Sequence, residues 1–346
     1  MFRQVEENPV HRLVRCNVNE ESYFMEMTLI RSIQRIERLR LYRSDVDDRG
    51  LAKPEGALGY VTVQEGNVPV FSLAKLLGRP LLRKGSKQDL SLKRIVVLSA
   101  RNERDGLKSE GVAVLVDRVS QVVHIEQEHI LSLPHLFKSI GVNSFSGVVS
   151  EGESMTLLLS PDELMASSSE HAKQKTSVNP FSAKSAIVGR GEQGEISRSS
   201  QKGKGRLLIF STERDLDVSL CLSISQVSEI MRQVEMIPVP LAPGYLYGII
   251  KWRNKAVPVV DLGYLLGLKR VKDNGIKAEQ RLMIARGASA DSLIGFPVNS
   301  DIRAQNLPAD YTHCERPVAL NHELVHTIVE MNQETLVMPD ISLVAC

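Results

Sequence analysis

Two stretches of the chain repeat the same pattern of apolar and polar positions. Residues 248–252 are rich in apolar and β-branched side chains, which favour a half-buried strand, and the polar residues 253–255 predict a tight turn. A second strand is predicted at 256–262, where Pro258 cannot donate to a ladder and indicates a strand edge, end or bulge. Residues 262–267, which end in glycine, predict a short helical turn. The stretch therefore predicts a hairpin that leads into a small cap, without a catalytic residue.

The same pattern occurs 189 residues earlier, because residues 59–79 align with 248–268 without a gap. The match keeps glycine, proline and the spacing of leucines together, which shared composition does not produce. We infer a two-copy array. The matching positions are Gly59 with Gly248, Val68-Pro69-Val70 with Val257-Pro258-Val259, and Leu73, Leu76, Leu77 and Gly78 with Leu262, Leu265, Leu266 and Gly267.

Short apolar runs separated by polar turns continue on both sides of these stretches. A pair of strands is predicted around the polar turn at 17–21, and a helical turn at 161–164 begins with proline. Many short strands with little helix are typical of a barrel or a sandwich. The other predicted strands are 95–98, 111–116, 122–125, 145–149 and 155–159 in the first half and 207–210, 216–222, 281–285, 293–298 and 328–338 in the second half.

Length and composition suit two soluble domains joined by a polar connection. The chain has 346 residues, of which 42% are hydrophobic and 24% charged, as in ordinary globular proteins. Ser, Lys, Gly and Gln dominate residues 167–204, which cannot bury enough apolar surface to offset the entropy of ordering them. We therefore expect one domain at 1–166, a flexible and disordered linker at 167–204, and a second domain at 205–346.

Charge and cysteine usage narrow the class of protein further. The net charge is only +2, so bulk charge does not argue for nucleic acid or a membrane surface as the main partner. The start of the chain lacks an apolar signal segment, and no run is long enough to span a bilayer. The four cysteines form no CxxC pair, which is typical of a reducing compartment. We expect a cytoplasmic protein. A basic stretch at 31–43 could meet an anionic surface, but a solvated face at the domain edge explains it more simply.

One motif suggests metal chemistry. Residues 322–326 read HELVH, which matches the HExxH pattern of helical zinc sites. The β-branched residues 327–329 favour a strand instead, in which His322 and His326 lack helical ligand geometry, and only 20 residues follow His326. A zinc peptidase is thus the third alternative, and we expect no cofactor, no metal and no enzyme activity.

The order and spacing of these marks resemble the CheW-like domain of bacterial chemosensory systems. The resemblance covers nearly everything outside the linker and the extreme termini. It implies a mainly β fold of two tandem CheW-like domains, each made of two small five-stranded SH3-like β-barrels with short helices. The marks are residues 227–230, Ala242-Pro243, Gly248, Arg253, Val257-Pro258-Val259 and Asp261-Leu262 in the second copy, and Gly59, Val68-Pro69-Val70, Leu73, Val116-Asp117-Arg118-Val119, Gly147-Val148-Val149 and residues 157–164 in the first.

The resemblance also implies a function without catalysis. Single-domain members of the family couple the cytoplasmic tips of methyl-accepting chemoreceptors to the histidine kinase CheA, whose regulatory domain is itself CheW-like. We therefore expect a chemotaxis scaffold whose partners are these receptors, CheA and other CheW-like proteins, with no nucleic acid and no direct membrane insertion. The alternative is an adaptor for another chemosensory output, such as type IV pilus twitching motility, without receptor contact.

Neither copy carries the complete family pattern. The hairpin arginine Arg253 is replaced by Gln64 in the first copy, and Asp261 is replaced by Ser72. Conversely, the first copy has Asp117-Arg118 where the second has Asn299-Ser300. The differences leave two alternatives: each copy keeps a different binding face, or one copy has become mainly structural. The expected partner-binding residues are Trp252, Arg253, Val257, Pro258, Val259 and Asp261 in the second copy and Val68, Pro69, Val70, Asp117 and Arg118 in the first.

In the second copy, the hairpin is expected to make the partner contact. Arg253 could form a two-pronged hydrogen bond with a partner carboxylate. Trp252 could supply an apolar anchor, or it could equally belong to the core, because a lone tryptophan is often well buried.

Overall fold

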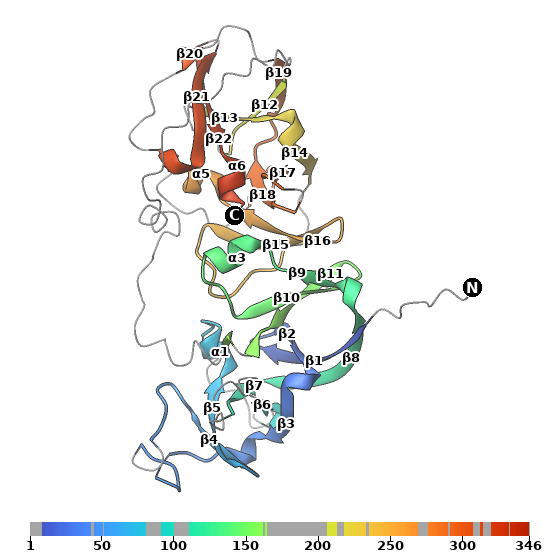
Figure 1. Cartoon of the computed structure of the whole chain (residues 1–346), viewed down its shortest axis with the longest axis vertical. Helices are drawn as coiled ribbons and strands as arrows, with labels where there is room; N and C mark the ends of the chain where they lie inside the picture. Colours follow the sequence, from blue (N-terminus) through green and yellow to red (C-terminus); the bar gives the residue numbers. More distant parts are fainter. Residues whose placement is uncertain are drawn as a thin grey trace, which may run out of the picture. The chain divides into compact units, whose positions relative to one another are not determined.

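The computed structural model describes most of the chain outside the predicted linker. The described residues are 9–42, 45–50, 52–80, 91–99, 111–161, 163–164, 206–212, 218–232, 235–268, 276–289, 291–306, 312–313, 320–331 and 333–345. They form two compact units, one mainly from the residues up to 164 and the other mainly from the residues after 205 (Figure 1). The predicted linker at 167–204 lies outside the described residues.

The first unit consists of two sheets and several short helices (Figure 1). Two neighbouring pairs, β2 with β11 and β5 with β7, run parallel, and the others run antiparallel. The six-stranded sheet has the order β8-β1-β2-β11-β10-β9, formed by β1 (Val10–Val18), β2 (Glu21–Glu26), β8 (Arg118–Glu126), β9 (Ile130–Ser132), β10 (Phe145–Glu151) and β11 (Ser154–Leu159). The five-stranded sheet has the order β3-β6-β7-β5-β4, formed by β3 (Ile30–Arg35), β4 (Gly59–Val63), β5 (Gly66–Ser72), β6 (Arg94–Leu98) and β7 (Ala113–Val116).

The second unit repeats this order strand for strand, again with two parallel pairs, β13 with β22 and β16 with β18. The six-stranded sheet has the order β19-β12-β13-β22-β21-β20, formed by β12 (Arg206–Phe210), β13 (Val218–Ser223), β19 (Arg303–Asn306), β20 (Thr312–His313), β21 (Val325–Met331) and β22 (Glu334–Pro339). The five-stranded sheet has the order β14-β17-β18-β16-β15, formed by β14 (Val227–Met231), β15 (Leu246–Trp252), β16 (Lys255–Val260), β17 (Arg281–Arg286) and β18 (Leu293–Val298).

The helices are short in both units. No helix among the described residues is long and apolar enough to cross a membrane. The first unit has η1 (Met27–Leu29), η2 (Ile36–Arg38), α1 (Leu73–Leu76) and η3 (Gln127–His129), and the second has α3 (His135–Ser139), η5 (Ile224–Gln226), α5 (Leu262–Leu265), η6 (His322–Leu324) and α6 (Ile341–Val344).

The predicted mainly β class and the two-copy array are confirmed, with one six-stranded and one five-stranded sheet in each copy. Two details differ from the sequence prediction. The single strand expected at 328–338 is split into β21 and β22, because the chain turns at Gln333, whose φ is 63°. The helix α3 was not predicted, since it is only five residues long.

The two repeated hairpins carry the core of the five-stranded sheets. In the second unit, Val257 and Val259 are fully buried among side chains of β15, β17 and β18. In the first, Val68 and Val70 occupy the same places and are at most 4% exposed. Residues two apart on a strand point to the same face of the sheet, so the repeated Val-Pro-Val places both valines of each copy in the core.

The repeated glycines mark a close crossing of two backbones. Tyr60, next to Gly59, exchanges two backbone hydrogen bonds of 2.8 Å with Arg40. Ile249, next to Gly248, pairs in the same way with Ile237 at 2.9 and 3.0 Å. A Cβ atom added to either glycine would collide with the carbonyl oxygen of the crossing residue. Only glycine allows this approach, which explains why the two copies share it.

Candidate protein-interaction site

The hairpin between β15 and β16 ends in a two-residue turn, in which the side chain of Arg253 is exposed. Arg253 and Asn254 have φ values of 45° and 59°, as in the type I′ turns that suit twisted hairpins. Left-handed backbone is ordinary for asparagine but costs a residue such as arginine about 1 kcal/mol. In the first unit Gln64 takes this place without a positive φ.

Trp252 lies in the core beneath this turn. It is 7% exposed and packs with Ile250 and Val257 of the same sheet. Its indole N–H donates to Glu229 Oε2 at 2.8 Å, so the polar edge of the ring has a partner in β14. Of the two predicted roles of Trp252, core residue or partner anchor, the geometry matches the core residue. Its hydrogen-bond partner Glu229 is half-buried.

The Val-Pro-Val segments of both hairpins are largely buried. Pro258 is buried between its two core valines, and Pro69 is half-buried. Both prolines sit in the strand next to the edge strand of their sheet. These six residues therefore shape the hairpins from inside, and their side chains offer a partner little area.

Asp261 is only 3% exposed and serves the second unit internally. One carboxylate oxygen accepts the backbone N–H of Tyr264 at 3.0 Å and caps α5. The other accepts the hydroxyl of Tyr247 at 2.8 Å. Ser72 caps α1 in the same manner, accepting from the backbone N–H of Lys75 at 3.4 Å. Aspartate and serine are both good N-cap residues, so the helix is capped in both copies although the residue differs.

Asp117 lies where the chain crosses from the five-stranded to the six-stranded sheet of the first unit. Its carboxylate accepts the backbone N–H of Asn19 at 2.9 Å and forms an ion pair with Lys93. Burial acts to raise its pKa, but the hydrogen bonds from Lys93 and Asn19 and the charge of Lys93 outweigh burial and lower it. The adjacent Arg118 begins β8 with an exposed side chain.

Asn299 occupies the place of Asp117 in the second unit. The backbone N–H of Asp117 donates to Asn17 O at 3.0 Å, and that of Asn299 donates to Ser211 O at 2.8 Å. The two crossings are thus equivalent, which supports the correspondence inferred from the sequence.

A pocket of about 80 Å³ opens where the two sheets of the first unit meet. It brings together Asp117 and Ser72, which the sequence singled out separately, and adds Lys93, which it did not. Lys93 is 24 residues from Asp117, and no periodic signal links them. The lining residues are Val18, Asn19, Leu58, Ser72, Ala74, Lys93, Leu115 and Asp117.

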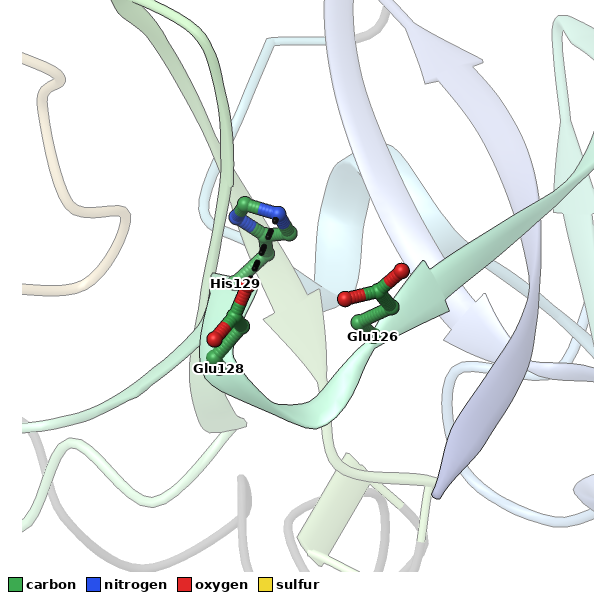
Figure 2. A group of neighbouring side chains, drawn as sticks. All are labelled: Glu126, Glu128 and His129. Atoms are coloured by element: carbon green, nitrogen blue, oxygen red, sulfur yellow. Dashed lines mark ion pairs between the residues drawn. The ribbon is translucent and has the colours of Figure 1, made fainter. Parts of the chain in front are cut away.

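Two groups could suggest a metal. Glu126, Glu128 and His129 place ligand atoms within 4.8 Å of one another at the end of β8, and Figure 2 shows His129 paired with Glu128, 3.8 Å apart. All three side chains are exposed, and exposed acidic groups commonly lie close together without binding a metal ion. The HExxH residues adopt the 3-10 helix η6 and the start of β21. The strand expected after His326 is therefore confirmed, and the two histidines do not share an α-helix.

Sequence and structure comparisons relate this chain to known proteins. A family model described as "CheW-like domain" matches residues 12–169 and 206–345. Over 53 residues the chain is 38% identical to "Chemotaxis protein CheW" of Rhizobium meliloti (strain 1021). The aligned segment covers 15% of this chain and 34% of that protein. The structure of the scaffolding protein TtCheW from Thermoanaerobacter tengcongensis aligns with a TM-score of 0.35 and 17% identity over 45% of this chain and 92% of that one.

Proposed function

This chain belongs to the CheW-like domain family and carries the domain twice, and we propose that it is a non-enzymatic chemosensory scaffold that couples methyl-accepting chemoreceptors to the histidine kinase CheA. The observation that carries the proposal is the exposed Arg253 at the turn of a hairpin whose strands contribute to the core of a CheW-like domain. We also propose that the protein is cytoplasmic and associates with receptor arrays through these partners.

The hairpin is suited to hold an arginine in a fixed position. Trp252, Val257 and Val259 anchor its two strands in the core, so little side-chain or loop ordering is needed on binding. A guanidinium can donate two parallel hydrogen bonds to a carboxylate of the partner. A charge-assisted hydrogen bond contributes about 1.5–3 kcal/mol, enough to decide between a bound and an unbound scaffold at micromolar concentrations.

Two tethered domains gain affinity without further contacts. When one domain is bound, the other experiences a high effective concentration of neighbouring sites. Copies with different surface residues, such as Arg253 and Gln64, suit two different partners better than two copies of one partner. No observation among the described residues favours the alternative adaptor for pilus motility.

Binding of the full chain to receptor-containing membranes and to CheA, measured separately, tests the proposal. We expect Arg253→Asn to weaken binding to one of the two partners about tenfold or more. Asparagine tolerates left-handed backbone, so this variant removes the guanidinium without new strain. The control is Arg281→Gln, which removes an exposed arginine from β17 of the same sheet and should leave binding unchanged.

Two outcomes would count against the proposal. If Arg253→Asn and the wild type bind both partners equally, the hairpin is not the contact. If the folded wild type binds neither receptors nor CheA from its own cells, the coupling role is wrong.

A further inference from the structure

The pocket of the first unit combines apolar walls with one pair of opposite charges. Leu58 and Leu115 contribute to its walls, and Lys93 and Asp117 form an ion pair in its lining. The side chains of Lys93 and Asp117 are 28% and 36% exposed, so both can be reached from solvent. The pocket is therefore neutral overall and accessible.

The ion pair can still form hydrogen bonds with a ligand. Among the described residues, Lys93 and the backbone N–H of Asn19 donate to Asp117, one to each oxygen. A carboxylate can accept about four hydrogen bonds, and an ammonium group has three donors. A donor and an acceptor thus lie side by side, beside an apolar surface.

The second unit has different side chains at the equivalent positions, and two of them bond to each other. The extended repeat alignment pairs Leu58 with Tyr247 and Ser72 with Asp261. Tyr247 donates its hydroxyl to Asp261 at 2.8 Å, which ties these two side chains together. Gly263 takes the place of Ala74, and a Cβ atom there would lie 2.9 Å from Thr212 Oγ1.

The charged pair is also absent from that place in the second unit. Lys93 directly precedes β6, and Gln280 directly precedes β17, so Gln280 and Asn299 stand for Lys93 and Asp117. Gln280 donates to Thr212 O at 2.8 Å, and Asn299 donates to Ser211 Oγ at 3.0 Å. Both are buried, at 7% and 8% exposure. The second unit uses these groups for its own structure, whereas the first leaves them accessible.

We propose that the pocket of the first unit receives a carboxamide side chain, glutamine or asparagine, from a partner protein. A carboxamide presents an N–H donor for Asp117 and a carbonyl acceptor for Lys93 at once. A charged side chain would instead have to compete with Lys93 or Asp117 for its counter-ion, leaving one charge uncompensated. The volume has room for several waters and so for one short side chain. The proposal names what the first copy recognises and rests on the scaffold function only for the identity of the partner.

A titration of the full chain without receptor or kinase tests this proposal. Its failure is therefore distinct from a failure of the coupling role. With the methyl groups isotopically labelled for NMR, N-acetylglutamine methylamide should shift Val18, Leu58 and Leu115 saturably at millimolar concentrations. N-acetylglutamate methylamide, which differs only in the carboxylate, should bind at least tenfold more weakly. Shifts that do not saturate, or that are equal for both compounds, would overturn the proposal.

A graft of the second unit's residues provides the matched variant. Leu58→Tyr with Ser72→Asp should fill the pocket and abolish the shifts at Val18 and Leu115, while the resonances of Val257 in the second unit stay in place. Lys93→Gln with Asp117→Asn is a second variant that keeps the pocket open and neutral and should weaken binding at least tenfold. Saturable shifts that survive in a folded form of either variant would place the ligand elsewhere and contradict the proposal.

Discussion

At the scale of single residues, burial separates two kinds of family position. Asp261 and Ser72 differ between the copies, yet each caps the helix that follows it. Trp252 is a core residue that holds Glu229. Arg253 and Arg118, in contrast, are exposed. Sequence alone could not separate these groups, because the same pattern of spacing marks positions that shape the domain and positions that face outward.

The Lys93–Asp117 ion pair predicts a particular pH dependence of stability. Because the pKa of Asp117 is lower in the folded chain than its ordinary value, the ionised form stabilises the fold above about pH 4, and this contribution is lost as the pH falls through the folded pKa. Asp117→Asn should therefore lower the urea midpoint of the first unit at pH 7, and the difference from wild type should shrink at pH 3 and below.

Circular dichroism would follow the unfolding of both units. The fluorescence of Trp252, the only tryptophan, reports the second unit and serves as the internal control. An equal difference between variant and wild type at both pH values would mean that the ion pair does not supply the stability.

At the scale of elements, the sequence predicted what is local and missed what is long-range. Both hairpins and strands such as 95–98 and 293–298 were identified, since alternation and turn residues are local signals. The parallel pairing of β2 with β11 joins segments far apart in the chain, and no pattern within either strand specifies it. The Lys93–Asp117 pair was missed for the same reason. The repeat alignment was the signal that could have exposed the contrast between the pocket of the first unit and the equivalent residues of the second.

The crossing at the repeated glycine predicts a sharp difference between two substitutions. Gly59→Ala places a methyl group against Arg40 O and Leu39 Cδ1, so it should destabilise the first unit by about 2–3 kcal/mol. In Gly152→Ala, in the β10–β11 turn, the added Cβ atom would meet nothing within 4 Å, so the substitution costs only the strain of a φ of 63°, about 1 kcal/mol.

Urea denaturation of both variants, followed by circular dichroism with Trp252 fluorescence as the reference, compares them directly. Equal losses of stability would show that the crossing relaxes around a side chain and that glycine is not required there.

At the scale of the whole molecule, one fold carries two different surfaces. The order of the strands is the same in the sheets of the two units, although buried and exposed residues at equivalent positions differ. The first copy keeps an open pocket with a charged pair, and the second keeps the hairpin arginine. A division of partners between the copies accounts for this pattern better than a simple doubling of one site.

The measurement that tests coupling most directly is whether the chain brings CheA to receptor-containing membranes. CheA and membranes are mixed with increasing amounts of the full chain, and the kinase in the membrane pellet is quantified. The account predicts that kinase sediments in proportion to added chain, passes through a maximum and falls when excess chain occupies both partners separately, and that Arg253→Asn suppresses the rise. If the chain itself reaches the pellet while the kinase stays in the supernatant at every concentration, the chain does not couple the two.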